Sequence, residues 1–236
     1  MLGEGRFKQI VREVQQYHEQ GLAVAAAMEM TIFELSWYLR GMENLLSDFY
    51  MNKPLAEGLL DRVTDFRCQM GLRYIEAGVD IVKLGDDVGT QRAMLMSPET
   101  WRTWLKPRLQ RVIATLKKAR PEVLIFYHSD GSIEPIIPDL IEIGVDILNP
   151  LQPECLDQAS IKRRFGRELA FWGGIGIQTT MPWGTPQEVK DTVRRAIEVL
   201  GSEGGFLIAP THVLEPEVPW ENIMAFVEAV KQYGQY

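Results

Sequence analysis

Short apolar runs that end in polar residues and glycine recur along this chain. The clearest covers residues 123–127, and His128-Ser129-Asp130-Gly131 follows it directly. A buried parallel strand has this pattern, because both of its faces are covered and its carboxyl end brings polar side chains to the rim of the sheet. Similar runs begin near residues 22, 80, 146, 169 and 205. We therefore expect six strands, with any ligand site at their carboxyl ends.

Between these strands, apolar residues recur at helical spacing. The spacing predicts helices over residues 5–19, 32–48, 54–78, 97–120, 133–143, 160–165, 186–200 and 220–233. Strands that alternate with helices indicate an α/β chain with a parallel sheet and right-handed crossovers. A closed barrel of this class has eight strands, so by this count two are missing.

The length of 236 residues suits one domain that spans residues 1–236. A net charge of -7 argues against nucleic acid and anionic membrane surfaces as partners. No apolar run approaches the roughly 20 residues that cross a bilayer, and the amino terminus lacks the apolar segment of a signal peptide. The two cysteines give no disulfide framework. We therefore expect a cytoplasmic protein.

Polar residues at the strand ends are the candidates for function. Among them His128, Asp130 and His212 form the combination that we rank highest. Two imidazoles and a carboxylate can bind a divalent metal and leave positions open for a substrate. The alternative is that one or both histidines orient a loop or hydrogen-bond a ligand without metal. The other candidates at strand ends are Asp86, Asp87, Gln91, Asn149, Gln152, Glu154, Cys155, Gln178 and Glu215.

Asp86 and Asp87 are adjacent, so they cannot face the same point in an extended strand. We expect Asp86 in the interior, where a carboxylate can act as acid, base or cation partner, and Asp87 to cap a turn or pair with a helix. Asn149 either stabilises a turn or contacts a substrate. His18 is expected to be a solvated surface residue. The residues expected to contact a small-molecule substrate are Asp87, Gln91, Asn149, Gln152 and Gln178.

Several segments also form a recognisable set. They are Gly78-Val79-Asp80 leading to Gly85-Asp86-Asp87, Ser97-Pro98-Glu99, Lys106-Pro107, Ile137-Pro138-Asp139, Gly173-Gly174-Ile175 and Ala209-Pro210-Thr211-His212. With these segments, from about residue 33 to residue 233, the chain resembles the uroporphyrinogen decarboxylase superfamily, which includes the decarboxylase and corrinoid-linked methyltransferases. The resemblance implies a (β/α)8 TIM barrel, with about six βα units in this chain and a pocket at the carboxyl-terminal mouth. It does not by itself fix the reaction.

Two departures from the family pattern narrow the expectations. The decarboxylase has an amino-terminal Arg-Gln-Ala-Gly-Arg segment that is absent here, and the resemblance begins near the family's third strand. We expect a piece or an internally started form of a longer protein, or a barrel that is open or completed by another copy in a homodimer. Family methyltransferases hold zinc through a His-x-Cys pair and a distant cysteine. The resemblance places His128-Ser129-Asp130 on that pair and His212 on the distant cysteine.

Imidazole and carboxylate make a harder metal site than thiolates do. The resemblance therefore implies a methyltransferase in which a divalent metal, zinc in the family, is bound by His128, Asp130 and His212 and polarises the oxygen of a methoxy compound or alcohol. A partner corrinoid protein would accept the methyl group, and Asp86 would protonate the leaving oxygen or hold the substrate. One alternative is metal-free decarboxylation of a tetrapyrrole or another carboxylate in porphyrin metabolism. A third reading is a non-catalytic, truncated relative.

Overall fold

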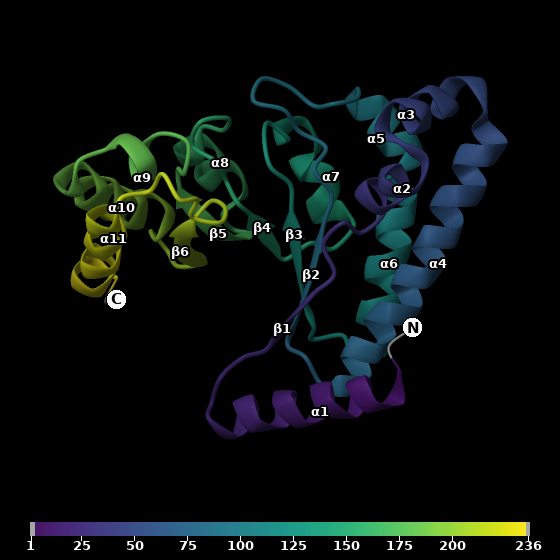
Figure 1. Cartoon of the computed structure of the whole chain (residues 1–236), viewed down its shortest axis with the longest axis horizontal. Coiled ribbons are helices and arrows are strands. Elements are labelled where there is room, and N and C mark those ends of the chain that lie inside the picture. Colours follow the sequence, from purple (N-terminus) through teal and green to yellow (C-terminus); the bar gives the residue numbers. More distant parts are fainter. Residues whose placement is uncertain (1–2, 235–236) are drawn as a thin grey trace. The chain divides into compact units, whose positions relative to one another are not determined.

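The computed structural model describes residues 3–234, which form two compact units (Figure 1). The first unit contains the residues up to Val88 together with Leu95–His128 and Pro135–Asp146. The second contains Gly89–Met94, Ser129–Glu134 and the residues from Ile147 onward. Each unit is built on three parallel strands.

The first unit is organised around β1 (Ala25–Ala27), β2 (Ile81–Gly85) and β3 (Leu124–His128). Val82 of the central strand lies opposite Ala26 of β1 and Ile125 of β3. Its helices are α1 (Glu4–Glu19), α2 (Phe33–Arg40), α3 (Met42–Met51), α4 (Lys53–Ala77), α5 (Pro98–Trp104), α6 (Lys106–Ala119) and α7 (Ile137–Glu142). The largest fully buried side chains of this unit include Trp101, Tyr127, Phe33, Phe49, Leu60 and Leu84.

Helices α4 and α6 lie side by side in Figure 1 and pack closely. Gly71 of α4 permits this approach, because a Cβ there would lie 2.5 Å from Cδ2 of Leu116 on α6. Gly58 lies more than three turns earlier on the same helix, and a Cβ there would have no atom of the described residues within 4 Å. Helix packing therefore requires a glycine at position 71, but it does not require one at position 58.

Several predicted helices are interrupted. The helix predicted over residues 32–48 is two helices, α2 and α3, because Gly41 between them has a φ of 86° that breaks the helical path. The helix predicted over residues 97–120 divides at Leu105, and Pro107 stands in the first turn of α6, where a missing N–H is tolerated. The helix predicted over residues 133–143 is a 3-10 turn, η1 (Glu134–Ile136), followed by α7.

His18 lies at the end of α1 with an exposed side chain, as expected, and it also has a specific partner. Its Nε2 lies 2.8 Å from Oδ2 of Asp80, and the same oxygen accepts the N–H of Val24 at 2.7 Å. Asp80 thereby links the end of α1, the segment before β1 and the start of β2. A partner 62 residues away in the sequence cannot be read from the amphipathic pattern of α1.

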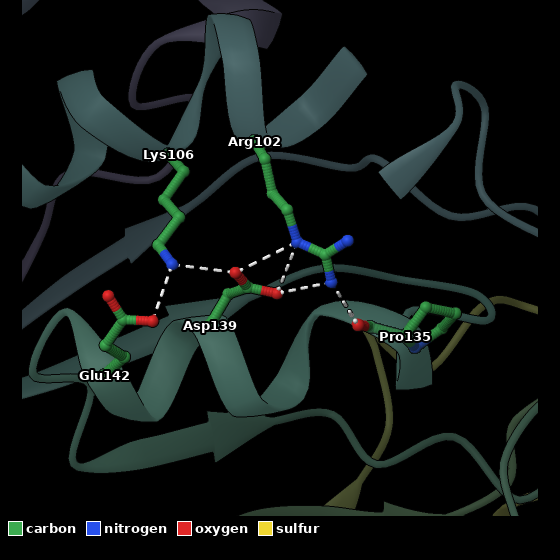
Figure 2. Close-up of polar contacts among 5 residues, drawn as sticks. All are labelled: Arg102, Lys106, Pro135, Asp139 and Glu142. Atoms are coloured by element: carbon green, nitrogen blue, oxygen red, sulfur yellow. Dashed lines mark hydrogen bonds and ion pairs between the residues drawn. The ribbon is translucent and has the colours of Figure 1, made fainter. Parts of the chain in front are cut away.

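Figure 2 shows that Asp139 of α7 lies between two cations from other helices. Arg102 of α5 donates from Nε to both carboxylate oxygens at 3.1 Å and from Nη2 to Oδ2 at 2.9 Å. Lys106 of α6 donates to Oδ1 at 2.8 Å and also to Glu142 at 2.8 Å. Lys106 and Asp139 belong to two of the segments on which the family resemblance rests, and their role here is to join α7 to α5 and α6.

The second unit is organised around β4 (Ile147–Asn149), β5 (Ala170–Ile175) and β6 (Phe206–Pro210). Its helices are α8 (Gln158–Phe165), α9 (Thr180–Trp183), α10 (Pro186–Leu200) and α11 (Trp220–Tyr233). Helices α10 and α11 have the predicted bounds and pack against each other. Thr185 and Glu188 form a capping box that fixes the start of α10. The short helix α9 was not predicted.

Within residues 3–234 the expected alternation of strands and helices is confirmed, with six parallel strands near the predicted positions. The chain is therefore of the α/β class. Over the same residues, no helix combines the length and the hydropathy needed to cross a lipid bilayer.

Candidate functional site

Two strand ends of the first unit meet at one rim. Strand β2 ends at Gly85 and is followed by Asp86 and Asp87, while β3 ends at His128. The register places Gly85 opposite His128, and the Asp86 N–H donates to the His128 carbonyl at 3.1 Å. A Cβ at Gly85 would lie 2.7 Å from Cβ of His128, so glycine allows the close approach. Oδ1 of Asp87 lies 3.6 Å from Nε2 of His128.

Asp86 is buried, as expected, and its carboxyl group faces the amino end of α2. The Ile32 N–H donates to both carboxyl oxygens at 3.0 Å, and the Glu34 N–H donates to Oδ1 at 3.0 Å. Burial raises the pKa of Asp86 to about 7, although these backbone donors favour the charged form and act in the opposite direction. The carboxyl group thus holds the start of α2 against the end of β2. Its predicted catalytic role stays a prediction.

Glu34 is a rim residue that the sequence analysis missed. It lies in the first turn of α2, and its Oε2 accepts the N–H of Asp87 at 3.1 Å. Its position in the first turn of the helix after β1 is the only sequence signal that points to it, and such carboxylates are common at helix starts for electrostatic reasons alone. Glu34, Asp87 and His128 together supply carboxylate and imidazole donors at this rim. Such donors suit a divalent cation or a hydrogen-bonding substrate.

Two cations near these strand ends are engaged with the segment that follows β1. Lys83 of β2 pairs with Glu29 at 2.7 Å, and its Nζ lies 5.0 Å from the centre of the Phe126 ring. Arg67 of α4 is buried and donates to the carbonyls of Met30 at 2.6 Å and Thr31 at 3.1 Å. These contacts order the loop that leads into α2.

Two amide side chains predicted to bind substrate have protein partners within the second unit. Nδ2 of Asn149 donates to the carbonyl of Trp172 at 2.7 Å, and Oε1 of Gln152 accepts the N–H of Gly131 at 3.1 Å. Both side chains are buried. Of the two interpretations of Asn149, these contacts favour stabilisation of the local backbone.

The remaining candidates also lie in the second unit. Oε1 of Gln91 accepts a hydrogen bond from the Cys155 thiol at 3.2 Å. Asp130 is partly exposed in the turn that follows β3, while Gln178 follows β5 and His212 follows β6, both with exposed side chains. The structure thus brings Asp87 to His128 within the first unit. The grouping of His128 with Asp130 and His212 as metal ligands stays a prediction.

A sequence profile described as uroporphyrinogen decarboxylase (URO-D) matches residues 7–233. The match confirms the resemblance and begins closer to the amino terminus than residue 33, where we expected it to start. Among curated relatives, the methylcobamide:CoM methyltransferase MtaA of Methanosarcina barkeri is 29% identical over 180 residues, which are 76% of this chain and 49% of that protein. The uroporphyrinogen decarboxylase of Synechocystis sp. is 26% identical over 79% of this chain and 50% of its own length. This chain therefore spans about half the length of the curated relatives it matches.

A solved structure, a methyltransferase from Methanosarcina mazei, superposes with a TM-score of 0.75 at 22% identity, covering 96% of this chain and 64% of that one. This likeness shows the fold and confirms the TIM-barrel type of α/β architecture. The relatives include both methyltransferases and decarboxylases, so the similarity is to a family with more than one reaction. Because the family profile covers nearly all of its residues, the chain belongs to the uroporphyrinogen decarboxylase family.

Proposed function

We propose that this chain acts in a methyltransferase that moves a methyl group from a small methoxy compound or alcohol to a corrinoid protein. The observation that supports this most directly is the pair of hard donors at the rim of the first unit, where Oδ1 of Asp87 lies 3.6 Å from Nε2 of His128. The relative from Methanosarcina barkeri is named for methyl transfer between a methylcobamide and CoM. A rim of carboxylate and imidazole, in place of thiolates, suits activation of an oxygen-bonded methyl group.

The donors at the rim fit a divalent metal. Two ligands that are each about 2.1 Å from a tetrahedral zinc lie about 3.4 Å apart, which is close to the separation of the Asp87 and His128 donor atoms. We assign His128, Asp130 and His212 as the ligands that the family resemblance implies, and the spacing of Asp87 from His128 lets it serve as a further ligand or contact a substrate bound there. A bound metal would supply Lewis-acid chemistry toward the oxygen of the methyl donor.

Asp86 and Asp87 have different roles in this proposal. A pKa of about 7 favours Asp86 as a proton donor, but both of its oxygens accept backbone N–H groups and its side chain is buried. We therefore assign Asp86 as a positioning residue that holds α2, and Glu34 with it, in place. Asp87 is partly exposed next to His128, so we assign it to contact the substrate. The methyl acceptor would be the corrinoid of a partner protein, and this chain would need none of its own.

The first test measures metal content by mass spectrometry in wild type, His128→Ala and a matched control. His18→Ala is the control, because His18 pairs with Asp80 at the end of α1 and not with the rim. Wild type and His18→Ala should hold close to one divalent ion per chain, and His128→Ala should lose it. Wild type that stays metal-free after purification under reducing, metal-supplemented conditions would overturn the metal assignment.

The second test follows methylation of an added corrinoid protein by its absorbance, with methanol and small methoxy compounds as donors. We expect His128→Ala and Asp87→Asn to lose at least about a hundredfold in rate, equivalent to about 2.7 kcal/mol of barrier. His18→Ala should keep the wild-type rate. Wild-type rates in both rim variants would show that the reaction does not use this rim.

A second candidate function is metal-free decarboxylation of a carboxylated tetrapyrrole. It is favoured by the decarboxylase relatives, which are similar to the same part of this chain. Such a substrate calls for free cations, whereas Lys83 and Arg67 already bind the segment after β1. Release of CO2 from carboxylated tetrapyrroles by metal-free wild type would favour this reaction over methyl transfer. Inactivity in both assays would favour the non-catalytic relative.

A further inference from the structure

A groove lies in the second unit between α8, the end of β5 and α10. Its volume is about 580 Å³, within the range of small-molecule sites. It adjoins a second hollow of about 420 Å³, with which it shares Thr179, Thr180, Thr192 and Arg195. Glu154 lines the first hollow, and Trp183 lines the second. The proposed methyl-transfer residues Glu34, Asp87 and His128 line neither hollow.

Glu154 offers a carboxylate oxygen that lacks a donor. Its Oε1 accepts a hydrogen bond from the Thr179 hydroxyl at 3.0 Å, while Oε2 is buried and has no hydrogen-bond partner among residues 3–234. Buried carboxylate oxygens are normally paired, so this one calls for an explanation. Glu154 as a whole is partly exposed and lines the groove. A donor in the groove can therefore reach this carboxylate.

The backbone after β5 is shaped to hold the Glu154 carboxylate. A Cβ at Gly176 would lie 2.2 Å from Oε1 of Glu154, closer than any side chain allows. Only glycine at this position leaves room for the carboxylate where it stands. Substitution of Gly176 by alanine would therefore displace the Glu154 carboxylate without changing its charge.

Arg195 of α10 offers the opposite charge. Its side chain is exposed, its Nη2 makes a long hydrogen bond of 3.4 Å to the Thr192 hydroxyl, and it forms no ion pair within the described residues. The adjacent Arg194, by contrast, lies 3.6 Å from a carboxylate oxygen of Asp191. The guanidinium of Arg195 is therefore available to an anionic group in the groove.

Two other acidic residues line these hollows, but both already accept backbone N–H groups. Asp157 accepts the Ser160 N–H at 3.0 Å at the start of α8, and Glu188 accepts the Thr185 N–H at 2.7 Å at the start of α10. Among the charged residues lining these hollows, Glu154 and Arg195 are thus the two that lack a charged or backbone partner in the part of the chain that the structure describes. A ligand with only one charge would pair with either Glu154 or Arg195 and leave the other group unpaired.

We propose that this groove binds a small zwitterion of the amino-acid class. Its ammonium group donates to the carboxylate of Glu154, and its carboxylate pairs with the guanidinium of Arg195. The hydroxyl groups of Thr179 and Thr192 lie beside these two charges. Trp183, which is 73% exposed, offers an apolar surface to the methylene groups of the ligand.

The test is a binding series on the full chain by calorimetry at constant ionic strength. The probes are ω-amino acids from glycine to 6-aminohexanoate, in which the two charges move apart by one methylene at a time, together with acetate and methylammonium as single-charge controls. We expect saturable binding with one preferred length, and at least tenfold weaker binding of either control. No saturable binding by any amino acid, or equally tight binding of acetate or methylammonium, would overturn the proposal.

Variants then assign the contacts. Glu154→Gln and Arg195→Gln should each weaken binding of the preferred amino acid at least tenfold, whereas Glu198→Gln and Arg194→Gln, which alter exposed charges on α10 outside the groove, should bind as wild type does. Unchanged binding in Glu154→Gln or Arg195→Gln would refute the assignment.

A third variant keeps the assignment testable if a charge variant does not fold. Gly176→Ala should weaken binding because its Cβ displaces the Glu154 carboxylate, and circular dichroism would verify that the variant folds. Wild-type affinity in a folded Gly176→Ala would count against a role for Glu154. Because binding is the readout, the result does not depend on methyl transfer.

Discussion

Asp139→Asn tests how much the ion network of Figure 2 contributes to stability. The Asp139 side chain is 9% exposed, while those of Lys106 and Arg102 are 16% and 47% exposed. Hydrogen bonds between charged groups are worth about 1.5–3 kcal/mol when buried, and exposed pairs are worth less than about 1 kcal/mol. The Lys106 pair should therefore contribute most of the loss and the Arg102 pair the smaller part. We expect the free energy of unfolding to fall by about 3 kcal/mol in total.

Glu142→Gln is the matched control, because Glu142 binds the same lysine but its side chain is 66% exposed. Its cost should stay below about 1 kcal/mol. Urea unfolding followed by tryptophan fluorescence at pH 7 gives both values. A loss within about 0.5 kcal/mol of zero for Asp139→Asn, or equal losses in the two variants, would refute the reasoning.

The effect of Asp139→Asn should also depend on pH. Burial acts to raise the pKa of Asp139, but hydrogen bonds from Arg102 and Lys106 outweigh it and hold the pKa below the ordinary value of 3.8. Because the folded state then binds the proton less tightly than the unfolded state, the contribution is fully present above the unfolded pKa and is lost as pH falls through the folded pKa. The difference between wild type and Asp139→Asn should be constant from about pH 5 to 8 and shrink below about pH 4. A difference that grows on acidification would contradict this sign.

Two further predictions concern the first unit. Asp86→Ala should destabilise the first unit by about 2–4 kcal/mol, because N–H groups at the start of α2 lose their acceptor. Asp86→Asn retains one acceptor oxygen, so it should cost less than half as much. Urea unfolding of both variants measures these losses, and equal losses would contradict the reasoning. Gly58→Ala should stabilise α4 by up to about 1 kcal/mol through helix propensity, whereas Gly71→Ala should lose that gain because its Cβ lies 2.5 Å from Leu116. Thermal unfolding of the two glycine variants should rank Gly58→Ala above Gly71→Ala, and the reverse order would contradict the packing argument.

The strands and the carboxyl-terminal helices were predictable because their signals are local. Helices α10 and α11 have the predicted bounds, and Thr185 and Glu188 supply an N-terminal signature within four residues of sequence. The break between α2 and α3 was missed because the apolar pattern continues through Gly41, whose positive φ ends the first helix. Periodicity reports which face of a helix is apolar, and it does not report a change of direction between two helices.

The candidate site was predictable in part for the same reason. Strand ends identified Asp86, Asp87 and His128, and adjacency alone indicated that the two aspartates face different ways. The partner of Asp86 was not predictable, because Ile32 is 54 residues away and becomes a neighbour only after the strands have paired. Glu34 was missed with it, since its place at the rim depends on where α2 begins.

The contact between Asp86 and α2 has a consequence for redesign of the chain. The dipeptide that follows β2 contains one carboxylate committed to a helix and one that faces His128. A library that varies both Asp86 and Asp87 would contain many variants that do not fold, because most substitutions at Asp86 remove the contact with α2. Any gain in substrate range from Asp87 would be lost in those variants. Randomisation at Glu34 and Asp87, with Asp86 kept, should sample new substrate preferences in variants that still fold.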